Sequence, residues 1–266
     1  MNYSSEAYDT SLIITNVSGC RLSATRRNAL FCFTADFKMK QATSSGSESS
    51  PWLLQIQSLL NSINHMLIFM VGAFFFTLAR SLEFQDTAMH MFMTGIGFHV
   101  LIAQALMSHY KVNRITRWLS HKNKSRLHGV LQLVGGSMVL LGALGKFSQK
   151  DVHFDTWHGR FGVAAAFGCA ASVVGGLVNF FQPKFALKVF PPSEMRFRHN
   201  LFGLLSFTIG MTAIYLGYYS KFFTRVVDHE FIPALMLTTV LVYLLTIIGP
   251  VGSLLTKLKY RRQKSA

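Results

Sequence analysis

The chain has 266 residues, of which 50% are apolar and 14% are charged, and its mean hydropathy is +0.33. These values argue against an ordinary soluble protein and indicate a membrane protein. Three cysteines without C-x-x-C or C-x-x-C-H spacing argue against a disulfide framework, a zinc ribbon and a covalently attached c-type haem. Any haem in this chain is therefore expected to be held non-covalently.

The chain divides into an extension, a membrane domain and a tail. Residues 1–51 end in the Ser-rich run QATSSGSESSP and are predicted to form a flexible extension without a core. Residues 52–256 contain six apolar stretches of the length that crosses about 30 Å of hydrocarbon as helix. They lie at about 54–79, 87–108, 127–146, 158–180, 199–220 and 231–255. The sequence therefore predicts an all-α membrane protein with six transmembrane helices, followed by a basic tail at 257–266.

Positive charge alternates between the predicted loops. The connection from Tyr110 to Arg126 has a formal charge of +6, residues 182–198 have +3, and the tail carries five bases. The three loops between these segments are close to neutral. Because Lys and Arg concentrate in cytoplasmic loops, the basic side and both termini are expected to be cytoplasmic. The net charge of +15 is then a topology signal that favours a lipid bilayer, and no nucleic acid, as the partner.

Four histidines lie near the N-terminal ends of predicted spans two to five: His90, His128, His158 and His199. Ionisable residues inside membrane spans are costly and tend to mark function. Because neighbouring spans run antiparallel, His90 and His158 are expected near the non-cytoplasmic face, and His128 and His199 near the cytoplasmic face. The sequence therefore predicts two histidine pairs at two depths.

Small residues follow these histidines on the same helix faces. A bis-histidine haem needs one imidazole from each of two facing helices and small side chains where the porphyrin lies. Residues at i+4 and i+7 share the face of residue i. These positions hold Thr94, Gly97, Gln132, Gly135, Gly162, Ala165, Gly203 and Ser206, of which only Gln132 is large. The alternative interpretation is that the small residues let membrane helices pack closely.

The other histidines are weaker candidates for ligands. His65 and His99 lie deeper in spans one and two and have no partner at equal depth, which favours a buried hydrogen bond for each. His109, His121 and His229 are interpreted as loop or interface residues.

The motifs around the four histidines resemble a known family. They are, in order, His90, AQALM at 103–107, RLHGVLQL at 126–133, HFDTWHGRFG at 153–162, QPK at 182–184 and RHNLFG at 198–203. This order resembles the cytochrome b561 family, in particular its animal D2-like branch of transmembrane reductases called cytochrome b561 domain-containing proteins. The resemblance covers about residues 52–260 and leaves out the first 50.

The resemblance implies a fold, two cofactors and an activity. The fold is a six-helix membrane protein in which spans two to five form a four-helix core that holds two b-type haems. As axial ligands of the haem irons, it pairs His90 with His158 on the non-cytoplasmic side and His128 with His199 on the cytoplasmic side. The implied activity is a transmembrane oxidoreductase that passes electrons from cytoplasmic ascorbate to ferric iron chelates or monodehydroascorbate.

Residues at the two faces are candidates for substrate contacts. Ascorbate is a monoanion at neutral pH, so cations beside the cytoplasmic histidines would attract it; the candidates are Lys122, Lys124, Arg126 and Arg198. The alternative is that these bases fix topology and touch lipid headgroups. On the other side, His153 precedes His158 by five residues and is a candidate for contact with the acceptor. A solvated loop histidine is the alternative there.

Two other classes of function compete with electron transfer. A histidine-lined transporter or proton channel without haem would need polar groups at the midplane and interrupted helices, and the spans offer His99, Gln104 and Gln132 with Pro250 in span six. A structural or regulatory membrane subunit is the third interpretation. An endomembrane or vesicle membrane is expected rather than the plasma membrane, and a homodimer is compatible with the sequence.

Overall fold

All the regular secondary structure in the part that the structure describes is helical. A computed structural model describes residues 51–265, so the predicted extension lies outside the described residues except for Pro51. The helices are α2 (Pro51–Ser81), α3 (Asp86–Gly95), the π-helix η1 (Ile96–Ile102), α4 (Ala103–Met107), α5 (His121–Ser148), α6 (Trp157–Phe181), α7 (Lys184–Val189), α8 (Pro192–Gly217), α9 (Lys221–Val226) and α10 (Phe231–Ser265). The segment predicted as a basic tail continues α10.

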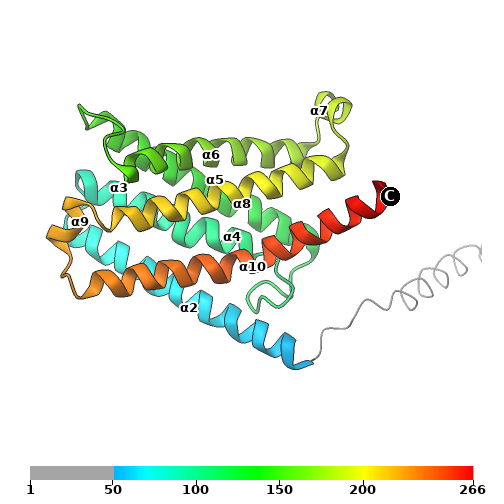
Figure 1. Ribbon diagram of the computed structural model, residues 1–266, viewed down its shortest axis with the longest axis horizontal. Helices are drawn as coiled ribbons and strands as arrows, with labels where there is room; N and C mark the ends of the chain where they lie inside the picture. The colour runs from blue at the N-terminus through cyan, green and yellow to red at the C-terminus, as the bar shows by residue number, and fades with distance from the viewer. Residues whose placement is uncertain (1–50, 266) are drawn as a thin grey trace, which may run out of the picture. The chain divides into compact units, whose positions relative to one another are not determined.

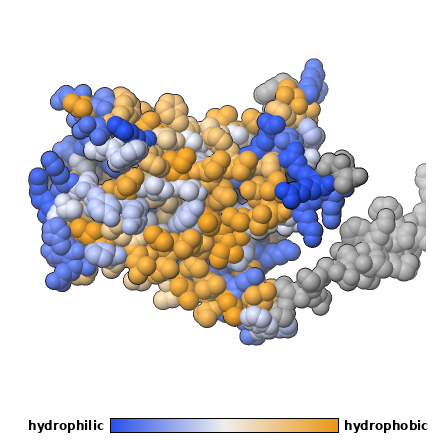
Figure 2. Space-filling model, in the orientation of Figure 1, coloured by the Kyte–Doolittle hydropathy of each residue, from blue (hydrophilic) through white to orange (hydrophobic). Residues whose placement is uncertain are grey.

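Six helical segments within 51–265 are long and apolar enough to cross a membrane, as predicted. They are α2, the run α3–η1–α4, α5, α6, α8 and α10. Figure 1 shows them side by side, with α7 and the C-terminal end of α10 at one end of the bundle and α9 at the other. Figure 2 shows a broad apolar surface between hydrophilic ends. We call the end with the connection 108–120, α7 and the end of α10 the basic end, and the other the neutral end.

Two of the helices begin earlier than the apolar pattern predicts. The expected spans start at about 127 and 199, whereas α5 begins at His121 and α8 at Pro192. Ser120 caps α5 by accepting a hydrogen bond from the backbone N–H of Asn123, and Pro192 has the fixed φ that suits a first helical position. Hydropathy detects only the apolar part of a helix, so the polar first turns at the basic end were missed. His128 and His199 consequently lie about two turns inside their helices rather than one.

The second span is not a uniform α-helix. η1 separates α3 from α4 and contains the fully buried His99. A π-turn takes in more residues than an α-turn and often accompanies functional sites. The sequence pattern did not predict this change, because hydropathy does not distinguish a π-turn from an α-turn.

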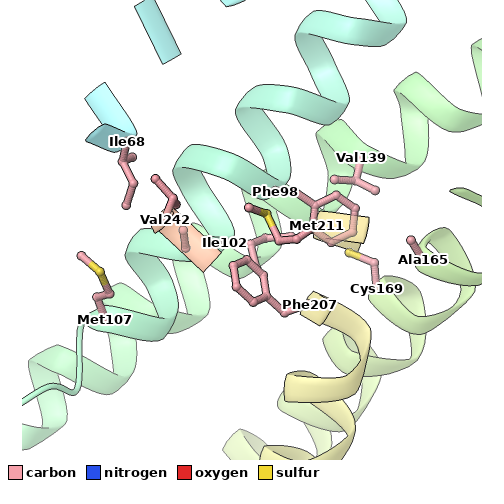
Figure 3. Packing of buried hydrophobic residues seen from close by; sticks show 11 residues of the cluster. Ile68, Phe98, Ile102, Met107, Val139, Ala165, Cys169, Phe207, Met211 and Val242 are labelled. Carbon is pink, nitrogen blue, oxygen red and sulfur yellow. The ribbon is translucent and has the colours of Figure 1, made fainter. Parts of the chain in front are cut away.

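Spans two to five form a closed ring of helices. α3 and η1 pack against α5, α5 against α6, α6 against α8, and α8 against η1, while α10 packs on the outside against α8 and α4. Figure 3 shows the apolar cluster that joins them, with Phe98 and Ile102 from η1, Cys169 from α6 and Phe207 and Met211 from α8. The four-helix core predicted for spans two to five is therefore the arrangement that the structure has.

The close approach of Phe98 on η1 to Gly210 on α8 gives a testable expectation. A Cβ on Gly210 would lie 2.3 to 2.7 Å from three ring atoms of Phe98. We expect Gly210→Ala to destabilise the protein by about 1–3 kcal/mol, the usual cost of overpacking, seen as a lower thermal midpoint of the purified full chain in detergent. Gly252→Ala is the matched control, because a Cβ there meets no atom within 4 Å. Equal midpoints for the two variants would contradict the expectation.

Candidate functional site

The four candidate histidines meet as two pairs across the helix ring. The ring centroids of His90 on α3 and His158 on α6 are 6.0 Å apart, with the ring planes at 79°. The ring centroids of His128 on α5 and His199 on α8 are 6.2 Å apart, with the planes at 87°. Both pairs join helices that are opposite each other in the ring, so each pair faces the interior of the four-helix core.

Backbone carbonyls fix the outer nitrogens of three of these rings. Nδ1 of His90 donates to the carbonyl oxygen of Gly142 at 2.9 Å, Nδ1 of His128 to that of Ala105 at 2.9 Å, and Nδ1 of His158 to that of Ala213 at 2.8 Å. A carbonyl only accepts, so the proton is on Nδ1 and the lone pair of Nε2 is available to a metal. Histidine ligands of metals commonly make such an outer hydrogen bond. The ring of His199 packs over Gly175 and Gly176 of α6 instead.

Two of these hydrogen bonds link the second span to α5, one near each histidine pair. His90 reaches α5 at Gly142, and His128 on α5 reaches back to Ala105 on α4. His128 and Gly142 are fourteen residues apart on α5, which at 1.5 Å per residue places the two pairs about 21 Å apart. His90 and Ala105 are fifteen residues apart, which is one residue more than the separation of His128 and Gly142. The π-helix η1 between them accommodates this extra residue. Each pair therefore lies near one end of the membrane-spanning region.

The spacing of each pair fits a haem iron between two imidazoles. Metal–imidazole nitrogen distances near 2.0 Å, with about 1.2 Å from nitrogen to ring centre, place two axial rings about 6.4 Å apart, close to the observed 6.0 and 6.2 Å. Among the described residues no three His, Cys, Asp or Glu side chains gather as a metal site. Two axial nitrogens without further protein ligands suit a porphyrin, which supplies the remaining four.

Two glycines beside the pairs leave room for a flat group. Gly162 follows His158 by four residues and Gly203 follows His199 by four, so each shares the face of its histidine. A Cβ at either glycine would meet no atom within 4 Å. These two positions support the prediction that small residues face the porphyrin.

Other small residues on the predicted faces pack helices together instead. A Cβ on Gly97 would lie 2.8 Å from the carbonyl oxygen of Gly135, so η1 and α5 touch there. Gly168 meets Ser206 in the same way between α6 and α8, and Gly142 meets Thr94 between α5 and α3. Ala165 is buried in the apolar cluster. Close packing, the alternative interpretation, therefore explains most of the small-residue pattern.

The predicted donor-side cations differ in their surroundings. Lys122 and Arg126 are exposed on the first turns of α5, and Lys124 is half-buried. Arg198 is paired: its Nε donates to Glu194 at 2.8 Å, and its guanidinium lies over the ring of Phe190 at 4.3 Å. Glu194 also pairs with Arg261 from α10. Arg198 is thus engaged within the protein, which weakens it as a contact for an anion.

The structure adds two residues that sequence reasoning did not select. The ring of His109, in the connection after α4, lies 5.4 Å from that of His128 and 5.6 Å from that of His121. Burial, together with nearby His128, His121, Lys124 and Lys257, lowers the pKa of His109 to about 4, so His109 is neutral at pH 7. Lys257 of α10 also interacts electrostatically with His199. Only the path of the connection brings His109 here, and no local pattern signals it.

At the neutral end, His153 stacks on an aromatic ring. Its ring lies 3.8 Å from that of Phe147 at an angle of 9°. Lys146 is nearby on α5, donates to the hydroxyl of Thr87 at 2.6 Å, and is within electrostatic range of His90, as is Lys150. His153 is therefore held in place rather than free in a loop.

The two deeper histidines make hydrogen bonds; that of His99 is buried, as predicted, whereas those of His65 are partly buried. His65 bonds to the side chains of Asn113 at 3.2 Å and Gln104 at 2.9 Å. His99 bonds to the hydroxyl of Thr239 at 3.0 Å. These contacts join the second span and the connection after it to α2 and α10, which carry none of the four paired histidines.

Comparison with known proteins places the chain in a family. The sequence profile described as eukaryotic cytochrome b561 matches residues 89–224. Transmembrane reductase CYB561D2 from Bos taurus is 32% identical over 142 residues, which are 52% of this chain and 63% of the relative; the protein of that name from Mus musculus is 30% identical over the same shares. The match thus spans less than two thirds of each relative's length. No solved structure matches significantly. Since the profile covers half of the sequence and all four paired histidines, the chain belongs to the eukaryotic cytochrome b561 family of haem-binding helical membrane proteins.

Proposed function

We propose that the protein is a two-haem transmembrane oxidoreductase. His128 and His199 hold one b-type haem at the basic end, and His90 and His158 hold the other at the neutral end. Electrons pass from ascorbate at the basic end, which faces the cytoplasm in an endomembrane or vesicle membrane, to ferric chelates or monodehydroascorbate on the other side. The names of the relatives, which describe transmembrane reductases, support this activity.

The observation that carries the proposal is the presence of two matched histidine pairs near opposite ends of one core. A b-type haem with two axial imidazoles supplies one-electron redox chemistry. The protein fixes the ring orientations through the carbonyls of Gly142, Ala105 and Ala213. Such hydrogen bonds raise the basicity of the ligand and influence the potential of the iron. Two sites about 21 Å apart along α5 divide the membrane crossing into shorter electron-transfer steps.

Cations at the basic end support an anionic donor. Lys124 and Lys257 both interact electrostatically with His109, which lies against the ligand His128. A local positive potential raises the concentration of an anion such as ascorbate and orients it. We assign the donor contact to these residues together with the exposed Lys122 and Arg126, and give Arg198 a structural role because of its pairing with Glu194.

At the neutral end, the stacked pair of His153 and Phe147 supports an acceptor site. The imidazole can hold a ferric chelate or give a proton to an organic acceptor. Lys146 and Lys150 would favour an acceptor with negative charge, because both lie in electrostatic range of His90.

The competing transporter hypothesis finds less support. A transport path near the midplane would use the polar groups of spans one, two and six. His65, Gln104 and His99 instead bond to neighbouring side chains in the packed interior.

Proteoliposomes provide the test of the proposed function. The purified full chain is reconstituted with ferric citrate trapped inside, and ascorbate is added outside. We expect ascorbate to reduce the b-type haems, which is seen as a change in their visible absorbance spectrum. We also expect the trapped ferric ion to become ferrous. Empty liposomes and a His90→Ala/His158→Ala double variant serve as controls, and the variant is expected to stop transfer to the trapped iron. A folded protein without haem absorbance would contradict the proposal.

A further inference from the structure

An open cleft lies at the basic end between the first turns of α2 and the connection 108–120. Its volume is about 340 Å³, and it is away from both histidine pairs. Three of its lining residues are cations and none is acidic. The lining residues are Leu54, Gln55, Ser58, Lys111, Val112, Arg114 and Arg117.

Buried polar contacts fix the connection so that its cations point outward. Asn113 and Thr116 are buried, and their side chains donate to the backbone carbonyls of Met107 and Ser108, each at 2.9 Å. The three cations Lys111, Arg114 and Arg117 occupy the exposed positions between and beside them. This loop is therefore a formed platform rather than a loose basic run.

One guanidinium is already oriented toward α2. Nε of Arg114 donates to Oγ of Ser58 at 3.0 Å, which leaves its two terminal nitrogens for a ligand. Guanidinium groups bind phosphate through paired hydrogen bonds in a fixed fork geometry. Gln55, whose side-chain amide is a neutral donor, also lines the cleft. The cleft thus offers several donors to a phosphoryl group and no carboxylate to repel it.

The cleft lies at the depth of lipid headgroups. α2 has 31 residues and is about 46 Å long, whereas about 20 residues cross the hydrocarbon. Counted from Arg80 at the neutral end, residues 51–60 extend beyond the hydrocarbon at the basic end. Trp118, 76% exposed, and Trp52, 62% exposed, are at the same end, as expected for aromatic residues at a membrane interface.

We propose that this cleft binds the phosphorylated headgroup of an anionic membrane lipid, of the phosphoinositide class. The monoester phosphate carries more negative charge than the diester of ordinary phospholipids and matches the three cations. The acyl chains lie along the exposed apolar side of α2 within the hydrocarbon, where Ile63 and Met66 are exposed. A soluble phosphate would gain nothing from these apolar residues.

Native mass spectrometry of the purified full chain in detergent tests this site. The probes are short-chain phosphatidylinositol 4-phosphate and phosphatidylcholine, titrated separately. We expect the phosphoinositide to bind the wild type in preference to phosphatidylcholine, and Arg114→Gln/Arg117→Gln to weaken it by about 10-fold or more, since each surface cation contributes to the attraction. The matched control is Lys184→Gln/Lys188→Gln on α7, which removes the same charge at the same end outside the cleft and is expected to bind like the wild type.

Three outcomes would overturn the assignment. If the two double variants weaken phosphoinositide binding equally, general charge attraction at the basic end explains the binding and the cleft does not. Equal binding of the two lipids by the wild type would remove the need for a phosphomonoester. Soluble inositol 1,4-bisphosphate that binds as tightly as the lipid would make the ligand a free phosphate. The haem spectrum of each variant, recorded in parallel, shows that the fold is intact, so the result is separate from that for the proposed electron transfer.

Discussion

Replacement of His128 by alanine is expected to remove the haem at the basic end and leave the other haem in place. The variant loses one of the two imidazoles of its pair, and His199 remains alone at 6.2 Å from the vacated ring position. The second pair is about 21 Å away along α5 and keeps its own hydrogen bonds to Gly142 and Ala213. The haem content measured as the pyridine complex should fall from two to one per chain, and a redox titration should show one remaining transition.

The same reasoning applied at the neutral end separates the pairs. His90→Ala should also halve the haem content, but the transition that remains should be the one lost in His128→Ala. His229→Ala is the matched control, because His229 is exposed and outside both pairs; it should retain two haems. If His90→Ala and His128→Ala abolish the same transition, the assignment of two independent pairs is wrong.

The residues that sequence reasoning placed well are those governed by the membrane itself. Antiparallel spans of fixed length put His90 and His158 at one depth and His128 and His199 at another, and the rings do meet in those pairs. The constraint is strong because a helix must satisfy its own backbone and cross a hydrocarbon layer of set thickness. The depth of a residue in the membrane can therefore be estimated by counting residues from the start of its span.

The features that sequence reasoning missed depend on side-chain contacts that composition and periodicity do not show. His109 reaches His128 because Asn113 and Thr116 fold the connection back onto α4. Arg198 is occupied by Glu194, a pairing that its i+4 spacing permits but that a count of bases overlooks. The small residues divide between helix contacts and open space according to how each helix is turned, as Gly97 and Gly203 illustrate. Periodicity gives the face of a helix but not what that face meets.

The open space beside Gly162 and Gly203 leads to the second large expected effect. Gly162→Leu should prevent haem binding by the His90–His158 pair and spare the His128–His199 pair, whereas Gly203→Leu should do the reverse. A side chain at either position meets no protein atom within 4 Å of its Cβ, and leucine favours a helix over glycine by about 1 kcal/mol. The helices themselves should therefore tolerate both changes. The leucine instead fills the face one turn from His158 or His199, where we propose that the porphyrin lies.

The matched control for these variants is Gly145→Leu on α5, since a Cβ at Gly145 also meets nothing within 4 Å but the residue is exposed. It should retain two haems per chain. The pair affected in each variant is identified by comparing its remaining redox transition with those of His90→Ala and His128→Ala. If Gly162→Leu and Gly203→Leu both keep two haems, the porphyrins do not lie on these glycine faces. A loss of haem in Gly145→Leu would mean that leucine at any open glycine disturbs the bundle. The expected result would place each porphyrin against the glycine one turn from its ligand, which ties the glycine pattern directly to the cofactor.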